Sequence, residues 1–205
     1  MADGPVIQRA SERALRQNFG ISDVLQIVSG ARKETDVPII LFSYFNPLLQ
    51  FGIEKLAHKA KGAGVGGILV TDLVPEEANE FASILRANDL DMIFLIAPTS
   101  TDQRLQMVAE RASGFIYAVS RAGITGARDE MSAEAEKLVR RMRKFSDLPI
   151  AVGFGISTPE HVKDVWRYAD AAVVGSAIVS EIEQAGASTD VISRLGRFTR
   201  QLIDK

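Results

Sequence analysis

The chain has 205 residues, with 24 lysines and arginines against 26 aspartates and glutamates, so its formal net charge is −2. This balance provides no basic field for nucleic acid and no polybasic segment for a membrane surface. The sequence has no cysteine, which excludes disulfides, thiolate nucleophiles and cysteine-ligated metals. Its two histidines are too few for a histidine-rich site, so we expect no bound metal. An apolar content of 46% fits one globular domain over residues 1–205.

Neither a membrane span nor a signal peptide is predicted. The longest apolar runs, such as residues 37–42, are much shorter than the ~20 residues that cross a bilayer. The first residues have neither the basic region nor the apolar core of a secretory signal. These features predict a cytoplasmic protein.

Short apolar runs alternate with amphipathic stretches along the whole chain. Each run is apolar at consecutive positions, which is typical of parallel strands buried on both faces. The runs cover residues 37–42, 67–70, 92–96, 114–119, 149–152 and 171–174. Their spacing of roughly 25–30 residues is the length of a strand–helix unit, so an α/β fold with six parallel strands is predicted.

Apolar residues at helical spacing lie before, between and after these runs. Two helices are expected before the first strand, at residues 6–18 and 22–35, and a last one at residues 190–203. The sequence STPE at 157–160 predicts a helix start, with a capping hydroxyl, an early proline and an acidic first turn. Trp166 lies on the apolar face of that helix and is expected in the core.

Strand–helix units either close into a barrel or form an open, doubly wound sheet. The open sheet usually has a glycine-rich turn after its first strand, whereas YFNP at 44–47 follows the first strand here. The pattern therefore favours a barrel. In such barrels the functional groups gather at the C-terminal ends of the strands.

Glycine motifs follow the last two predicted strands, GFGIS at 153–157 and GSAI at 175–178. Glycine lets the backbone approach a ligand, and the helix that follows points N–H groups at an anion. Either motif alone is compatible with an ordinary turn, but the last two strands are the usual phosphate position in these barrels. We predict that Gly155, Gly175 and Ser176 converge on a phosphate.

Several other residues are weighed as functional or as purely structural. The segment SRAGITG at 120–126 is either a mobile lid, with Arg121 pairing with a phosphate or carboxylate, or a surface loop. Asp3 lies in a turn-like ADGP segment. Asp72 follows a buried strand and is either a functional carboxylate or a cap of the next turn. His58 and His161 are expected to be solvated surface residues.

Four motifs together resemble the tryptophan synthase α subunit family: ADGPVIQ at 2–8, VSRAGITG at 119–126, GFGIS at 153–157 and GSAIV at 175–179. Their order and spacing match from Ala2 to the last helix. Other phosphate-binding barrels share the glycine pairs but not the SRxGxTG segment. The resemblance implies a TIM barrel and a lyase of tryptophan biosynthesis. Its reaction is the retro-aldol cleavage of indole-3-glycerol phosphate to indole and glyceraldehyde 3-phosphate.

The resemblance also implies roles for single residues. Asp3 would be the catalytic aspartate that contacts the indole N–H, and Thr125 would touch it when the lid with Arg121 closes. The residues implied to hold the phosphate are Gly126, Gly155, Gly175 and Ser176. Those implied around the glycerol and the indole are Tyr117, Phe42, Leu69 and Leu95.

No cofactor is implied on this chain. In the family, indole passes to a partner β subunit that uses pyridoxal phosphate, so the resemblance implies an α2β2 complex with that subunit. Two alternatives stay open: a catalytically impaired fragment that only binds the β subunit, and another phosphate-sugar enzyme on the same barrel.

The printed sequence departs from the family at its start. The family has a strand, a helix and a second strand with a catalytic glutamate before the ADGP segment, and these have no counterpart here. The six predicted strands are therefore equivalent to the family's third to eighth, and an incomplete TIM barrel with two open edges is expected. Because Asp3 is one of two required carboxylates, cleavage by this chain is expected to be slow.

Overall fold

Six parallel strands form one sheet in the order in which they occur along the chain. The computed structural model of the protein describes residues 3–119, 128–153, 155–186 and 189–203. The strands are β1 (Ile40–Ser43), β2 (Gly67–Val70), β3 (Asp91–Ile96), β4 (Ile116–Val119), β5 (Ile150–Gly153) and β6 (Ala171–Val173). All six predicted strands are confirmed. The first begins later than its apolar run, because Val37 lies in a loop with 65% of its surface exposed.

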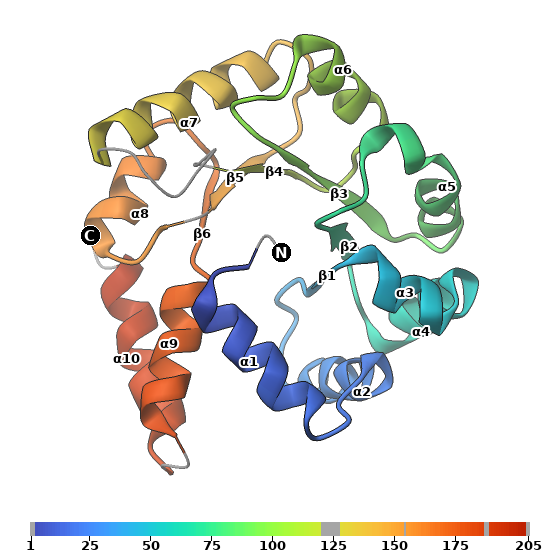
Figure 1. The fold of residues 1–205 in the computed structure, drawn as a ribbon, viewed down its shortest axis with the longest axis vertical. Helices are drawn as coiled ribbons and strands as arrows, with labels where there is room; N and C mark the ends of the chain where they lie inside the picture. Colours follow the sequence, from blue (N-terminus) through green and yellow to red (C-terminus); the bar gives the residue numbers. More distant parts are fainter. Residues whose placement is uncertain (1–2, 120–127, 154, 187–188, 204–205) are drawn as a thin grey trace.

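Helices surround the sheet on its outer side, while the N-terminal segment lies inside the ring of strands (Figure 1). Their bounds are α1 (Pro5–Leu15), α2 (Ile21–Ala31), α3 (Phe45–Phe51), α4 (Ile53–Ala63), η1 (Pro75–Glu77), α5 (Asn79–Ala87), α6 (Asp102–Arg111), α7 (Arg128–Met142), α8 (Pro159–Val165), α9 (Ser176–Ala185) and α10 (Val191–Ile203). Helix α1 lies between α2 and α9 in this ring (Figure 1). No helix in the described ranges is long and apolar enough to cross a membrane.

The sheet curls into an incomplete barrel whose edges are β1 and β6. Central strands such as β2 and β5 are buried at every position, as expected for parallel strands covered on both faces. The edge strand β6 has no fully buried residue. The predicted architecture, six parallel strands in chain order with helices outside, is therefore confirmed.

Side chains on the central strands alternate between two clusters. Ile68 and Val70 of β2 belong to the main core between the sheet and the helices, whereas Leu69 points to the opposite face. The same alternation places Tyr117 of β4 on the inner face, against Leu69 and Ile93. Because strand side chains alternate with a period of two, one face of the sheet builds the core and the other lines the interior of the ring.

Helix α3 directly follows β1, where the sequence suggested only a strand end. Its first N–H group, from Phe45, donates to the Asp72 carboxylate at 2.7 Å. Asp72 comes from the end of the neighbouring strand, so this contact joins two successive strand–helix connections. Asp72 therefore caps an earlier helix, and not the turn that follows it as the sequence suggested, because the described turn η1 has no side-chain cap.

Trp166 is a correction to the sequence analysis. It forms the C-terminal cap of α8 and has 43% of its surface exposed. The core face of this helix is instead made by Val162 and Val165, both buried. The helix ends one residue before Trp166, so the apolar periodicity that suggested burial does not extend to this position.

Two adjacent leucines of α3 allow a matched test of the core. Leu48 is 1% exposed and Leu49 is 53% exposed. We expect Leu48→Ala to lower the free energy of unfolding by about 2–5 kcal/mol, because it leaves a cavity. Leu49→Ala should stay within about 0.5 kcal/mol of the parent. Urea unfolding of both variants measures this, and equal effects would contradict the assigned orientation of α3.

Candidate functional site

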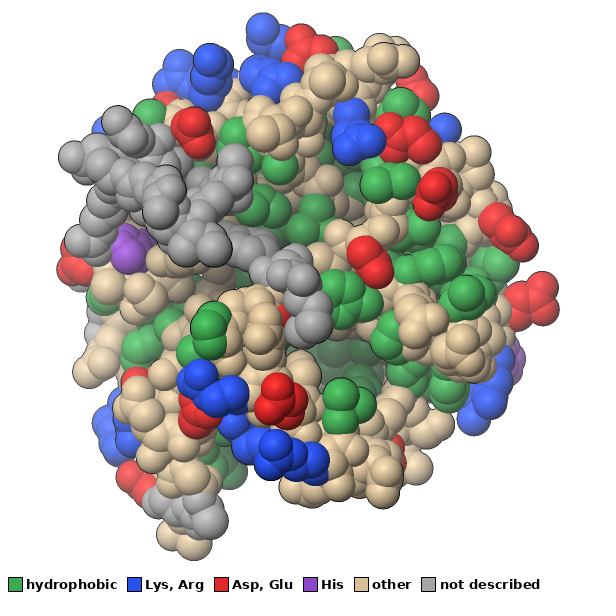
Figure 2. Space-filling view, viewed as in Figure 1, with side chains coloured by type: hydrophobic (Ala, Val, Ile, Leu, Met, Phe, Trp, Pro, Cys, Tyr) green, Lys and Arg blue, Asp and Glu red, His purple; other side chains and the backbone are tan. Residues whose placement is uncertain are grey.

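A cavity of ≈ 520 Å³ lies at the inner face of the curled sheet. Figure 2 shows a recess in this region with hydrophobic side chains at its floor. Its walls come from segments far apart in the sequence: Asp3, Gly4, Ile7, Ser11, Phe42, Ser43, Tyr44, Thr71, Tyr117, Gly155, Ile156, Val173, Gly175 and Ser176. Most of these residues lie on α1, within the strands or just after their C-terminal ends, which is where barrels of this type place their functional groups.

One end of the cavity presents backbone N–H groups. Gly175 and Ser176 form the start of α9, which has no side-chain N-cap hydrogen bond and no acidic residue in its first turn. The positive end of this helix dipole is therefore not neutralised locally. Gly155 lines the same cavity with a φ of +78°, a conformation that favours glycine. The structure thus brings Gly155, Gly175 and Ser176 to one cavity, and this end suits an anion.

Another wall is apolar. Phe42 of β1 has 54% of its surface exposed although it lines the cavity, and its ring centroid lies 6.0 Å from that of Tyr117. Ile156 and Val173 add aliphatic surface. An exposed phenylalanine inside a concave site suits a flat apolar ligand, because the ligand would remove that surface from water.

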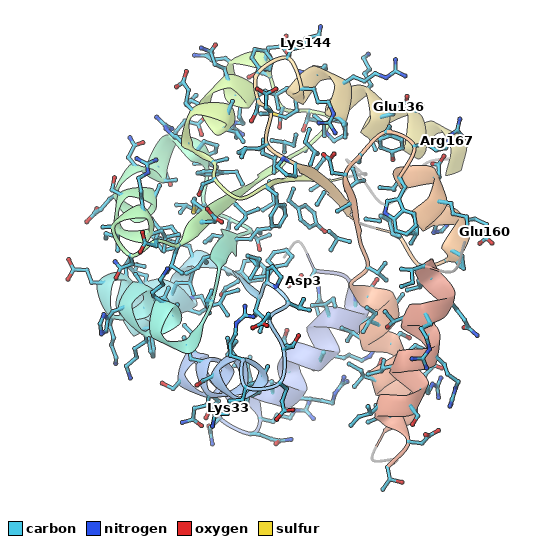
Figure 3. The ribbon with its side chains drawn as sticks, turned by 180° about the vertical axis from the view of Figure 1, so that it is seen from behind. Asp3, Lys33, Glu136, Lys144, Glu160 and Arg167 are labelled. Carbon is cyan, nitrogen blue, oxygen red and sulfur yellow. The ribbon has the colours of Figure 1, made fainter. Side chains whose placement is uncertain are left out.

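Asp3 is the only carboxylate among the described lining residues. Its Oδ2 accepts a hydrogen bond of 2.8 Å from the Tyr44 hydroxyl, and its backbone carbonyl accepts one of 2.7 Å from the Gln8 side chain. Seen from behind, Asp3 lies within the ring (Figure 3). The other labelled charged residues lie around the outside: Lys33, Glu136, Lys144, Glu160 and Arg167.

Tyr117 fills the interior next to the cavity. Its side chain is almost fully buried, and this burial raises the pKa of its phenol to about 12. The hydroxyl is therefore protonated at neutral pH and can both donate and accept hydrogen bonds. It passes over Gly153 of β5, where a Cβ atom would overlap the phenol oxygen. The Tyr117 ring fits because residue 153 is a glycine and has no side chain.

Helices α1 and α9 are joined by an ion-pair group that we call the Glu183 clamp, made of Glu183, Arg9 and Arg13. Arg9 donates to both carboxylate oxygens of Glu183, at 2.9 and 2.7 Å, and Arg13 donates at 2.8 Å. The hydrogen bond from Arg9, with further help from Arg13, lowers the pKa of Glu183 to about 2. Glu183 is thus ionised at any ordinary pH.

The remaining predicted residues lie in different places. Leu69 and Leu95 are part of the cluster around Tyr117 and are not among the cavity walls. Arg121, Thr125 and Gly126 lie outside the described residues, so their predicted roles in the lid and the phosphate site stay predictions.

The histidine interpretation is correct for one residue and wrong for the other. His58 is exposed on α4, as expected. His161 is half-buried. Its Nδ1 accepts the backbone N–H of Ser157 at 3.2 Å, and its backbone N–H donates to the Thr158 hydroxyl at 3.3 Å. It holds the end of the segment that begins at Gly155. The first turn of the helix that follows this segment is polar. This sequence feature could have predicted a hydrogen bond between the helix start and the segment.

Tyr44 is one of the cavity residues to which sequence reasoning assigned no role. Its place directly after β1 was a usable signal, because it puts the side chain at the C-terminal end of a strand. Its partner Asp3 is 41 positions away, and nothing local in the sequence announces that pair. Among the described residues, no group of three or more carboxylates or histidines could hold a metal ion.

Comparison with known proteins gives a consistent result. The sequence profile of the family described as "Tryptophan synthase alpha chain" matches residues 1–203. The tryptophan synthase alpha chain of Solibacter usitatus is 46% identical over 202 residues, which cover 98% of this chain and 76% of that protein. The alpha chain of Roseiflexus is 44% identical, with 98% and 77% covered.

Solved structures show the same similarity in three dimensions. A chain in a structure of the tryptophan synthase α2β2 complex from Pyrococcus furiosus superposes with a TM-score of 0.91 at 37% identity, covering 99% of this chain and 82% of that one. Tryptophan synthase subunit alpha from Legionella pneumophila gives a TM-score of 0.89 at 36% identity, covering 98% and 75%.

The close approach of Tyr117 to Gly153 predicts a strong steric effect. We expect Gly153→Ala to destabilise the fold by about 1–3 kcal/mol, since the added methyl group must displace the phenol. Combining it with Tyr117→Leu should cost less than the sum of the two single changes. Gly62→Ala, with open space around its Cβ position, is the control and should not destabilise. Strict additivity in urea unfolding would contradict the steric explanation.

The Glu183 clamp predicts a pH-dependent contribution to stability. The pKa of Glu183 is lowered from 4.5 to about 2, so the unfolded chain binds more protons than the folded one between these values. The contribution is therefore complete above about pH 5 and is lost as the pH falls toward 2. Arg9 and Arg13 face Glu183, and Glu12 acts on Arg9.

The measurement compares melting temperatures of the parent and Glu183→Gln across this pH range at low ionic strength. We expect the difference between them to be largest above about pH 5 and to shrink with acid or with high salt. A difference that is constant from pH 6 to pH 2 would show that the ion pairs do not stabilise the fold.

Proposed function

Because the chain belongs to the tryptophan synthase alpha chain family, we propose that it is the lyase that cleaves indole-3-glycerol phosphate into indole and glyceraldehyde 3-phosphate. One observation supports this most directly. A single cavity joins a carboxylate, an apolar wall and the N-terminus of a helix, which are the three surfaces that an indole linked to a phosphate requires.

The substrate would lie across the cavity with its two ends in different surroundings. The phosphate suits Gly155, Gly175 and Ser176, where N–H groups of α9 point at the anion. The indole suits the wall at Phe42, and the glycerol lies between them beside Tyr117. Leu69 and Leu95 support this wall from the cluster beneath Tyr117. Gly126, Thr125 and Arg121 keep the roles that the family motif implies, phosphate contact and closure of the lid.

The reaction breaks the bond between C3 of the indole and the first carbon of the glycerol chain. C3 gains a proton, and the hydroxyl on that glycerol carbon loses one and becomes the aldehyde. Positive charge develops on the indole ring while C3 is protonated. The Asp3 carboxylate, placed at the indole N–H, stabilises this charge, and the apolar wall strengthens the interaction by excluding water.

Asp3 has acceptor capacity left for this role. A carboxylate has about four lone-pair sites, and the Tyr44 hydroxyl occupies one at Oδ2. The hydrogen bond from Tyr44 also fixes the orientation of the carboxylate plane. The two proton transfers are a separate task, for which the family uses a second carboxylate.

We further propose that this chain acts with a tryptophan synthase β subunit. The similar Pyrococcus furiosus chains come from structures of the tryptophan synthase complex, one of them described as α2β2. Indole is a neutral product that the β subunit would receive and use with its pyridoxal phosphate. This chain would hold no cofactor of its own. The similarity to alpha chains throughout does not favour the alternatives of a binding-only fragment or of another phosphate-sugar enzyme.

The decisive experiment measures indole released from indole-3-glycerol phosphate by the purified chain with the β subunit. We expect Asp3→Asn to lower this rate by about 10²–10³-fold, because it removes the charge that stabilises the cationic indole. Asp72→Asn is the matched control, since that carboxylate caps Phe45 outside the cavity and should leave the rate unchanged. The same assay measures whether cleavage by this chain is slow, as the sequence analysis expects.

Two results would overturn the proposal. One is the absence of indole release by the parent chain when the β subunit is present. The other is an Asp3→Asn variant as active as the parent, which would exclude Asp3 from the reaction.

A further inference from the structure

We propose that Glu183 is a positioning residue, which sets the distance between Asp3 and the phosphate end of the cavity by holding α1 against α9. This inference rests on the proposed function, because it assigns the two ends of the cavity to the two ends of one substrate. It concerns a residue outside the cavity, which touches no ligand and acts through Asp3.

Both helices begin at the cavity. Asp3 lies two positions before Pro5, the first residue of α1, and Ser176 is the first residue of α9. The two helices lie side by side in Figure 1 and pack against each other. The distance from Asp3 to Ser176 therefore depends on the position of one helix along the other, and a substrate of fixed length fits only one such distance.

The clamp is the directional contact between these helices. Neither α1 nor α9 has a fully buried residue, so no fully buried side chain fixes the pair in register. The side-chain bonds that the structure describes between the two helices are those of Arg9 and Arg13 with Glu183. The bond between Tyr44 and Asp3 ties the start of α1 to β1 on the other side of the cavity.

The geometry of the clamp suits a register device. Arg9 and Arg13 are one helical turn apart on α1, so their guanidinium groups repel each other unless an anion lies between them. Arg9 binds both oxygens of Glu183, and this two-pronged contact fixes direction as well as distance. Sliding by one turn would bring only one of the two arginines to Glu183. The pair therefore has one preferred offset.

A purely stabilising role is the competing explanation. The three side chains are partly exposed, at 50% for Arg9, 46% for Arg13 and 28% for Glu183, and exposed pairs usually add little stability. Helix α9 provides a matched control. Glu181, two positions earlier and 23% exposed, binds Arg194 of α10 at 2.6 Å. Glu181→Gln removes an equivalent ion pair of the same helix without touching α1.

The test measures the affinity of two ligands by calorimetry. Glycerol 3-phosphate reaches only the phosphate end. The indole ligand, 3-(indol-3-yl)propyl phosphate, reaches both ends and has no hydroxyl, so it cannot be cleaved. We expect Glu183→Gln to weaken binding of the indole ligand by about three- to tenfold. This is a fraction of what the loss of one charged hydrogen bond costs, because Glu183 acts on the ligand only through Asp3. Its affinity for glycerol 3-phosphate should change by less than about twofold.

Glu181→Gln should leave both affinities within about twofold of the parent. A second measurement asks whether Glu183 acts through Asp3. In an Asp3→Ala background, the loss caused by Glu183→Gln should disappear, because no carboxylate is left to position. Arg9→Gln, which breaks the same clamp from α1, should reproduce the pattern of Glu183→Gln and replaces it if that variant does not fold.

Several results would overturn the inference. They are an equal loss for both ligands, an equal loss with Glu181→Gln, and a loss that persists in the Asp3→Ala background. Failure of the proposed function has a different signature. In that case the parent chain itself would bind glycerol 3-phosphate but not the indole ligand, or would bind neither.

Discussion

The two-residue alternation of side chains along the parallel strands is the constraint on which the site depends. It sends Ile68 and Val70 toward the helices and Leu69 toward the interior, so one set of strands makes both the core and the cavity wall. Curling of the sheet then turns the inner set into a concave surface. Tyr117 can fill that interior only because β5 has Gly153 opposite it. A shift of register by one residue would exchange the core for the cavity.

The polar groups of the site lie outside this alternating framework, at the ends of elements. Gly155 follows β5, Gly175 follows β6, and Asp3 precedes α1. Groups at the ends of elements are less constrained by packing than strand side chains, so the structure holds them with hydrogen bonds. Tyr44 holds Asp3, and His161 holds Ser157 at the end of the Gly155 segment. The polar groups of the site thus lie on segments supported by hydrogen bonds, next to a rigid apolar wall.

Local pattern was sufficient to locate the strands and to bring three predicted residues to one cavity. Consecutive apolar residues located all six strands, and glycines after the last two strands located Gly155, Gly175 and Ser176 at the cavity. Pairs of residues far apart in the sequence were not predictable in this way. Arg9 and Glu183 are separated by 174 positions, and each alone resembles any surface charge on a helix. The half-buried His161 and the exposed Trp166 show the same limit, because the burial of a helix end depends on its neighbours.

The proposed indole end and the proposed phosphate end of the cavity therefore depend on different kinds of interaction. An apolar wall binds without strict direction, and its favourable energy grows with the area that leaves water. The carboxylate and the helix N-terminus act by direction and distance, so a displacement of about 1 Å is costly for them. A cavity that joins both needs a rigid spacer between its directional groups. Helix α1 begins two residues after Asp3, and α9 begins at Ser176. These two helices, fixed to each other at Glu183, form that spacer outside the barrel wall.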